Sequence, residues 1–298
     1  MSNAPFFSII IATYNRANFI TKTLQSIIDQ EFSDFEVILV DDGSTDQTKE
    51  VVDPFLSDKV QYFYKQNGER GAARNYGIKK AKGKFLTFID SDDLMYTNHL
   101  QVAYDFLNSN DEVVFYGQAY ETKDQNGKIL IAHKEILNPN QSLLKGNFLS
   151  CIGVFIKRQN FHDEGFMFSE VRAFSGTEDW ACWLQVLARH RLCYQNIVTA
   201  CMIEHDTRSV LHFKASQLLD RTTILVSILQ NDQVFKTVFG QKIIDKINAH
   251  MWSYGALHLA LSNQKKAAFK WYKNAIALNI GEIFSRRFLA TIKIIMLK

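Results

Sequence analysis

The sequence predicts an α/β protein: a mostly parallel β-sheet covered by helices on both faces, followed by an all-helical C-terminal segment. In the first third of the chain, short continuous apolar runs alternate with helical patterns. This alternation is typical of buried parallel strands joined by right-handed helical crossovers. From about residue 215 onward the periodicity is helical only. We therefore expect one α/β domain over residues 1–213 and a helical extension over residues 214–298.

Four strands are expected in the first third, and polar or acidic residues follow each of them. Ligands of open α/β sheets bind outside the carboxyl ends of the strands. The polar residues after these strands are therefore expected to converge on one crevice. The predicted strands cover residues 6–12, 35–40, 60–64 and 85–89.

The middle of the chain is less regular. Residues 113–121 and 129–131 are expected to form strands around an Asn126-Gly127 turn. Residues 149–156 are a further apolar run, and residues 180–187 carry an apolar stripe at helical spacing. The region after residue 213 is expected to contain helices alone.

Composition excludes several classes of protein. With 47% hydrophobic and 22% charged residues, the chain is an ordinary globular one. No apolar run approaches the roughly 20 residues that span a bilayer, and the N-terminus lacks secretory-signal features. A net charge of +3 gives no reason to expect a nucleic-acid partner. Four cysteines without CxxC spacing favour a reduced, cytoplasmic protein without a zinc site.

The segment Asp90-Ser91-Asp92-Asp93 follows the fourth predicted strand. Three carboxylates this close repel one another unless a cation or donor group neutralises them. Carboxylate oxygens suit Mg²⁺ or Mn²⁺, which are often held by one or two carboxylates together with substrate phosphates. The alternative is a solvated acidic turn that caps a helix starting near Thr97.

Two further polar segments follow the second and third strands. Asp42 lies in Asp41-Asp42-Gly43-Ser44, which suits either an ordinary turn and helix cap or a hydrogen bond to a nucleobase or ribose. Residues 66–75 form a Gly-containing loop and helix start, in which Arg70 and Arg74 are a candidate anion site. This loop matches neither a Walker loop nor a GxGxxG fingerprint.

Glu178 and Asp179 begin the apolar stripe, and His205 follows a strand-like stretch. Acidic residues in a first helical turn are explained by the helix dipole, or one of them could serve as a general base. His205 is either a satisfied surface histidine or a contact to a diphosphate or metal ion.

Together these motifs resemble the family 2 glycosyltransferases of the GT-A fold, especially bacterial enzymes of surface-polysaccharide synthesis. The resemblance covers about residues 6–212. It is carried by residues 8–16, 40–46, 71–75 and 88–93 and by the Glu178-Asp179-Trp180-x-x-Trp183-Leu184 segment. The order and spacing of these motifs match the family.

The resemblance implies a donor site for a nucleotide sugar. Thr13, Tyr14 and Asp42 would contact the base, and Arg74 would contact the nucleotide. Asp90 would bind the ribose or sugar side. Arg16 and Asp93 complete the expected donor-binding set: Thr13, Tyr14, Arg16, Asp42, Arg74, Asp90 and Asp93.

The resemblance also implies a metal ion and a catalytic base. Asp92 would hold Mn²⁺ or Mg²⁺, and His205 is its candidate partner. Asp179 would be the base, with Glu178 positioning the acceptor. The family pattern has an Arg two residues before the histidine, where this chain has Ile203.

The expected function is that of an inverting, metal-dependent glycosyltransferase. Its donor would be a nucleotide-diphosphate sugar, with UDP as the family default, and its acceptor a saccharide or lipid-linked hydroxyl. A nucleotidyltransferase is the second hypothesis, although the Gly-rich loop that usually follows its first strand is missing here. A non-catalytic binding module is the third, and the clustered carboxylates argue against it.

Two segments of the C-terminal extension could meet partners, and each has a purely structural alternative. Residues 255–279 resemble one tetratricopeptide unit, which cannot bury its own face and should pack on neighbouring helices or on a second chain. For this first segment that alternative is a helical hairpin that completes the domain, in place of a peptide-binding repeat. Residues 263–298 carry eight Lys and Arg against one acidic residue. Within them, residues 282–298 are either a basic amphipathic helix at the inner face of the membrane or a core helix with snorkelling cations.

Overall fold

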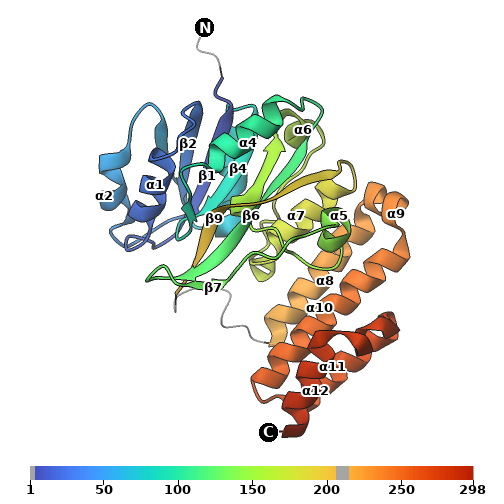
Figure 1. Cartoon of the computed structure of the whole chain (residues 1–298). Helices are drawn as coiled ribbons and strands as arrows, with labels where there is room; N and C mark the ends of the chain where they lie inside the picture. The colour runs from blue at the N-terminus through green and yellow to red at the C-terminus, as the bar shows by residue number, and fades with distance from the viewer. Residues whose placement is uncertain (1–3, 206–214, 298) are drawn as a thin grey trace.

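The computed structural model describes residues 4–205 and 215–297 (Figure 1). Its centre is a nine-stranded sheet with the order β3-β2-β1-β4-β8-β6-β9-β5, in which β7 pairs with β6. The first four strands are parallel to one another, as the sequence predicts, and their ends agree within a residue or two. They are β1 (Phe7–Thr13), β2 (Phe35–Asp41), β3 (Val60–Tyr64) and β4 (Phe85–Asp90).

The other half of the sheet is mixed, so the expectation of a mostly parallel sheet holds for the first half alone. Strand β8 runs antiparallel to both β4 and β6, while β9 runs parallel to β6. A parallel pair needs a long crossover, whereas β6 and β7 are joined by the predicted Asn126-Gly127 turn and are antiparallel. These strands are β5 (Leu94–Met95), β6 (Phe115–Asp124), β7 (Ile129–Ile131), β8 (Val154–Lys157) and β9 (Leu192–Glu204).

The apolar run over residues 149–156 is only partly a strand. Cys151–Gly153 form a short 3₁₀ turn, η2, and the strand β8 starts after it. Gly153 passes so close to β6 that a Cβ atom there would lie 2.5 Å from the carbonyl oxygen of Gln118. The turn therefore lets the chain enter the sheet against β6.

Helices cover both faces of the sheet, and the alternation of side chains along β1 explains why. Phe7, Ile9 and Ile11 pack with α1 and α4 on one face, while Ile10 packs with α3 and α7 on the other. All four side chains are fully buried. The helices of this part are α1 (Ile20–Ile28), α2 (Thr48–Val52), α3 (Glu69–Lys80), α4 (His99–Asn108), α5 (Pro139–Leu143), α6 (Arg158–Asp163) and α7 (Glu178–Leu187), with 3₁₀ turns η1 (Asp53–Phe55) and η3 (Arg172–Phe174).

The C-terminal part is helical, as predicted. Leu225 of α8 and Ile247 of α10 belong to the same core as Trp183 of α7, so these helices extend the core beneath α7. The predicted boundary at residue 213 lies outside the described residues. The elements are α8 (Ala215–Asn231), α9 (Gln233–Phe239), α10 (Gln241–Leu261), α11 (Lys265–Leu278), η4 (Ile280–Phe284) and α12 (Arg286–Leu297).

The tetratricopeptide-like segment packs on its neighbouring helices. The rings of Trp252 and Trp271 lie 4.7 Å apart between α10 and α11, and those of Tyr272 and Phe288 lie 5.1 Å apart between α11 and α12. Gly255 allows this approach, because a Cβ atom there would lie 2.2 Å from the Trp271 ring. Among the helices of the described residues, none combines the length and the apolar character needed to cross a membrane.

Candidate active site

A cavity of about 500 Å³ lies where the parallel strands end. Asp42 follows β2, Asp92 follows β4 and Asp179 begins α7, yet all three line this cavity. The predicted convergence of separate loops is therefore present in the structure. Of the eleven residues expected to serve in donor binding, metal binding or catalysis, nine line the cavity: Thr13, Tyr14, Arg16, Asp42, Arg74, Asp90, Asp92, Glu178 and Asp179.

Asp42 lines the cavity and is almost fully buried. Its Oδ1 accepts hydrogen bonds from Lys65 Nζ at 2.6 Å and from the Gly68 backbone N–H at 3.0 Å. Nearby, the Tyr14 ring is 47% exposed, and the buried Thr13 Oγ1 has no hydrogen-bond partner in the described structure. Thr13, Tyr14 and Asp42 thus combine a flat exposed ring with buried polar atoms, a combination that can recognise a planar, polar group.

The loops after β1 and β2 are tied together beside Asp42. Asn15 has a φ of 51°, a left-handed conformation that asparagine tolerates better than most residues. Its Oδ1 accepts the backbone N–H of Thr45 at 2.8 Å. The Asp46 side chain accepts the backbone N–H of Ala17 at 3.1 Å and that of Thr48 at 3.0 Å. These contacts hold Tyr14 and Arg16 beside the cavity.

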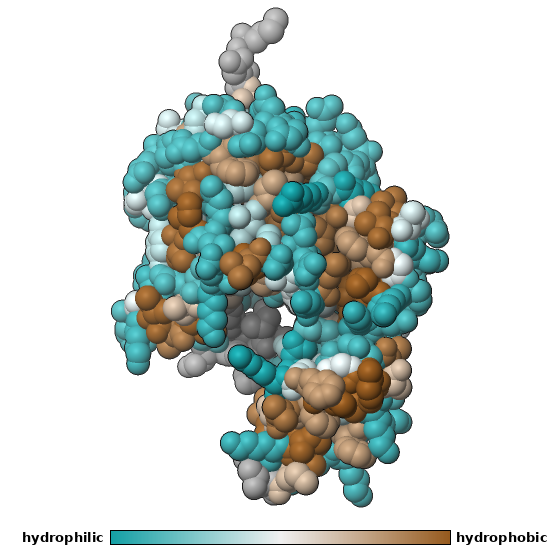
Figure 2. Space-filling model, turned by 45° about the vertical axis from the view of Figure 1, so that its right-hand side comes forward, coloured by the Kyte–Doolittle hydropathy of each residue, from teal (hydrophilic) through white to brown (hydrophobic). Residues whose placement is uncertain are grey.

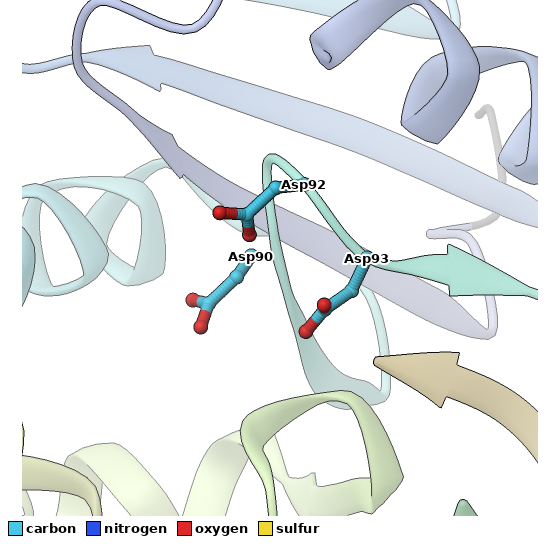
Figure 3. A group of neighbouring side chains, drawn as sticks. All are labelled: Asp90, Asp92 and Asp93. Carbon is cyan, nitrogen blue, oxygen red and sulfur yellow. The ribbon is translucent and has the colours of Figure 1, made fainter. Parts of the chain in front are cut away.

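The three aspartates after β4 gather at one turn (Figure 3). One carboxylate oxygen from each of Asp90, Asp92 and Asp93 lies within 4.8 Å of the others. Asp90 and Asp92 line the cavity, whereas Asp93 is fully buried beside it and accepts the backbone N–H of Ile203 at 3.1 Å.

Positive and donor groups surround Asp92. Its Oδ2 lies 3.0 Å from His205 Nε2 and 3.5 Å from Arg16 Nε. His205 is buried and stacks on the ring of Phe19, with centroids 4.4 Å apart. His205 thus contacts Asp92 without lining the cavity itself, and residues 206–209, which follow it, lie outside the described residues.

The donor set at this turn fits a hard divalent cation. Three carboxylates within reach of one another supply oxygen ligands, and a histidine nitrogen adjoins Asp92. The acidic turn does not cap α4, because that helix begins at His99, after Asn98, with no side-chain cap. The alternative that the three aspartates cap the following helix therefore does not explain why they lie together.

Arg74 links the acidic turn to α7. Its buried guanidinium donates to Asp90 Oδ1 at 2.6 Å and to Glu178 Oε1 at 2.9 Å, and it lies over the Phe168 ring. The sequence suggested an anion site at this position. In the structure both contacts are to carboxylates of the protein, although Arg74 still lines the cavity.

Glu178 and Asp179 occupy the N-terminus of α7 in different ways. The buried Glu178 accepts the backbone N–H groups of Gly176 and Thr177 through Oε2. Asp179 accepts the Trp180 N–H at 2.7 Å and the Asn147 side chain at 3.0 Å. Burial, reinforced by the negative charge of Glu178, raises the pKa of Asp179 to about 6. A carboxylate with a pKa near neutrality is suited to general-base chemistry.

Some cavity residues were not found from the sequence. Tyr120 lines the cavity from the interior strand β6, Arg172 from η3 and Asn147 from the segment between α5 and η2. Arg172 forms an ion pair with Glu69 at 2.5 Å and donates to Asn67 Oδ1 at 2.7 Å. None of these three follows a predicted parallel strand or belongs to a recognised motif, so no sequence pattern indicated them.

Comparison with known proteins identifies the family. Residues 8–165 match the family model described as Glycosyl transferase family 2. The chain is 34% identical over 205 residues to an uncharacterized glycosyltransferase of Rickettsia bellii, and the match covers 65% of this chain and 29% of that protein. It is 28% identical over 252 residues to the Escherichia coli UDP-Glc:alpha-D-GlcNAc-diphosphoundecaprenol beta-1,3-glucosyltransferase WfgD, covering 83% of this chain and 96% of WfgD.

Solved structures share the fold. The structure of Staphylococcus aureus TarS residues 1–349 in complex with UDP-GlcNAc matches with a TM-score of 0.69 at 20% identity, covering 97% of this chain and 88% of TarS 1–349. The mannosyltransferase PcManGT of Pyrobaculum calidifontis, in complex with GDP-Man and Mn²⁺, matches with a TM-score of 0.56 at 17% identity, covering 96% and 89%. The fold is therefore GT-A, as expected from the sequence.

The matched part of the chain spans about 30% of the length of the first rickettsial relatives. The family match nevertheless covers more than half of this chain and contains Asp42, Arg74 and the Asp90–Asp93 turn. These findings favour the glycosyltransferase hypothesis over the nucleotidyltransferase and the binding module. The chain belongs to the family 2 glycosyltransferases.

Proposed function

We propose that this chain is an inverting, metal-dependent glycosyltransferase that moves a sugar from a UDP-linked donor to a hydroxyl of a lipid-linked acceptor during surface-polysaccharide synthesis. One observation carries the proposal: Asp42, Asp92 and Asp179 line a single cavity. The names of WfgD and of the TarS complex support UDP as the nucleotide, and WfgD supports a diphosphate-lipid acceptor.

The donor would bind with its base against Asp42 and Tyr14. The exposed Tyr14 ring offers a stacking face, and the buried Asp42 carboxylate offers an acceptor for a base N–H. Asp90, which lines the cavity next to Arg74, would meet the ribose or sugar hydroxyls. Arg16 would approach the diphosphate, since it lines the cavity from the β1–α1 loop and its Nε lies 3.5 Å from Asp92 Oδ2.

Asp92 and His205 would hold the divalent cation, with Asp90 and Asp93 completing the negative charge of the turn. Mn²⁺ or Mg²⁺ bound there would stabilise the charge of the leaving nucleoside diphosphate. Arg16 supplies a further positive charge on the same side of the cavity.

Asp179 would take the proton of the acceptor hydroxyl as the oxygen attacks the anomeric carbon. The bond between that carbon and the donor diphosphate breaks in the same displacement, which inverts the configuration. Asn147 orients the Asp179 carboxylate, and Glu178 stays fixed by the backbone N–H groups before α7. A general base of this kind typically contributes about 10²–10⁴-fold in rate.

A thermal-shift panel tests the proposal. Sugars linked to UDP, GDP and dTDP are added with and without Mn²⁺, because a ligand that binds only the folded state raises the apparent stability. We expect UDP-sugars with Mn²⁺ to give the largest rise, and Asp42→Asn to reduce it, whereas the exposed Glu50→Gln leaves it unchanged. No rise with any nucleotide sugar would contradict the proposal, and so would a rise with nucleoside triphosphates alone.

A lipid-linked acceptor lies in a membrane, and we propose that the η4–α12 segment docks on an anionic membrane surface. One face of α12 packs on α10 and α11, with Thr291 fully buried. The opposite face presents Arg286, Leu289, Lys293 and Met296 at helical spacing. Basic and apolar side chains thus alternate along one exposed stripe.

The neighbouring residues extend this docking surface. Phe284 of η4 is 83% exposed and Ile280 is 67% exposed, which the alternative of a core helix does not explain. Figure 2 shows hydrophobic and hydrophilic residues intermixed on the helices at this end of the molecule. In Figure 1 the same helices project beyond the end of the sheet opposite the N-terminus, the end at which β1 finishes. The surface thus lies toward the side on which the cavity forms.

Co-sedimentation with vesicles tests membrane docking. We expect the full chain to pellet with vesicles that contain phosphatidylglycerol and much less with pure phosphatidylcholine, because each basic residue near an anionic surface contributes about 1 kcal/mol. Arg286→Glu with Lys293→Glu, and separately Phe284→Ser, should weaken pelleting. Equal pelleting of these variants and the parent would overturn the docking proposal, as would a second copy of the chain occupying this face in solution.

A further inference from the structure

Arg221 reaches the active site from the helical extension. It lies on α8, is 9% exposed, and donates from its guanidinium to the carbonyl oxygen of Ser175. Ser175 belongs to the loop between η3 and α7, so this contact joins the extension to the start of the helix that carries Asp179. Arg221 belongs to none of the motifs recognised in the sequence.

The turn beneath Arg221 has a special backbone. Gly176 has a φ of 90°, a conformation that favours glycine, and a Cβ atom there would lie 3.0 Å from the Arg221 guanidinium. In the same turn, the backbone N–H groups of Gly176 and Thr177 both donate to Glu178 Oε2. Gly176 itself lines the cavity. Arg221 therefore covers the turn that holds Glu178.

Charge supports the same arrangement. Glu178 is 2% exposed, and its Oε1 accepts from Arg74 at 2.9 Å on the other side. Burial lowers the pKa of Arg221, and the negative charge of Glu178 opposes that effect. The Glu178 carboxylate thus forms an ion pair with Arg74 of the α/β part and interacts electrostatically with Arg221 of the extension.

We propose that Arg221 is a positioning residue of the active site: it fixes the Ser175–Thr177 turn, and through Glu178 it sets where the Asp179 carboxylate lies. The inference rests on the proposed function of Asp179 as the base. It makes the helical extension part of the catalytic centre, because one of its side chains determines the geometry at the start of α7.

A matched contact at the other end of α7 provides the control. Arg189 follows α7 and donates to Asp232 at the α8–α9 junction at 2.8 Å and 3.1 Å. It therefore joins the same two parts of the chain, and it is absent from the cavity lining. Arg189→Ala should lower the melting temperature without changing the active site.

The experiment compares Arg221→Ala, Arg221→Lys and Arg189→Ala by UDP release from UDP-glucose and UDP-GlcNAc, UDP affinity with Mn²⁺, and melting temperature. We expect Arg221→Ala to lower kcat about 10- to 100-fold, as a misplacement near 1 Å does, while the Kd of UDP changes less than about threefold. Arg221→Lys, which keeps a donor for Ser175, should recover part of kcat. Arg189→Ala should keep kcat.

The outcomes separate the inference from the proposed function. If the parent chain releases no UDP from any donor, the proposed function fails, and the crystal structure of Arg221→Ala then tests positioning directly. A displaced Gly176 turn and Glu178 carboxylate would support the inference. Unchanged positions would overturn it, and so would a kcat of Arg221→Ala equal to that of Arg189→Ala.

Discussion

The side-chain amide of Asn147 donates to Asp179 Oδ2 at 3.0 Å, in the cavity that Asp90 and Asp92 of the acidic turn also line. This contact uses one oxygen of the carboxylate, while the Trp180 backbone N–H uses the other. Burial and the negative charge of Glu178 raise the pKa of Asp179, whereas the positive charge of Arg74 and these two donors lower it, and the balance leaves the pKa at about 6. The local structure therefore keeps a carboxylate oriented and still basic enough to accept a proton.

Asp179→Asn should remove turnover and keep donor binding. Asparagine preserves the size of the side chain but cannot accept the acceptor proton, so kcat should fall about 10²–10⁴-fold. The Kd of UDP with Mn²⁺, measured by calorimetry, should stay within about twofold, because Asp42 and Asp92 are untouched. Turnover within threefold of the parent would exclude Asp179 as the base.

The rate should fall in acid with an apparent pKa near 6. Asp179 acts as a base only when it is deprotonated, and its pKa is raised to about 6, so kcat should rise through pH 6 and level off above pH 7. A pH–rate profile of UDP release checks this. A profile that stays flat between pH 5 and pH 8 would contradict the assignment, provided that the fold is intact over that range.

The raised pKa of Asp179 also makes the stability of the folded chain depend on pH. The pKa of Asp179 in the folded chain lies above its ordinary value of 3.8, so the folded state binds this proton more tightly than the unfolded state does. The resulting stabilisation is present below about pH 4 and is lost as the pH rises through 6. Asp179→Asn, which stays uncharged, should therefore melt at a higher temperature than the parent at pH 7.5. If Asp179→Asn instead melted at a lower temperature than the parent at pH 7.5, the charged Asp179 carboxylate would not destabilise the folded state.

The parallel half of the fold and the acidic cluster were predictable because each depends on local sequence. Continuous apolar runs such as residues 6–12 indicate strands buried on both faces. The residues that follow a parallel strand lie at the edge of the sheet where ligands bind. The mixed half was not predictable, since β8 and β9 pair through contacts far apart in the chain. Arg221 and Asn147 gave no signal for the same reason: each acts on a neighbour more than 30 residues away.

Asp92→Asn should weaken metal-dependent donor binding. Loss of one negative charge leaves fewer anionic ligands for a divalent cation at the turn, so the Kd of UDP in Mn²⁺ should rise at least about tenfold. In EDTA the variant and the parent should bind UDP equally. The exposed Glu50→Gln controls for a change of net charge, and equal Mn²⁺ dependence of Asp92→Asn and the parent would remove Asp92 from the metal site.

Gly71→Ala should destabilise the chain, because helix α3 approaches the segment before α7 at this residue. A Cβ atom on Gly71 would lie 2.1 Å from the Ser169 carbonyl oxygen. One helical turn further, the Asn75 side chain accepts from the Phe168 N–H at 3.0 Å and donates to its carbonyl oxygen at 2.8 Å. Gly71 and Asn75 thus hold one stretch of backbone against the same face of α3.

A methyl group at Gly71 must push that stretch away or break the Asn75 contacts, and overpacking of this kind costs about 1–3 kcal/mol. Thermal unfolding of Gly71→Ala should show the loss, while Ala72→Ser, one residue along the helix and partly exposed, should change stability much less. Because the displaced stretch leads into the turn that holds Glu178, Gly71→Ala should also lower kcat more than it changes UDP affinity. If both variants unfold at the same temperature, the backbone beside α3 can accommodate a methyl group at Gly71, and the predicted overpacking is absent.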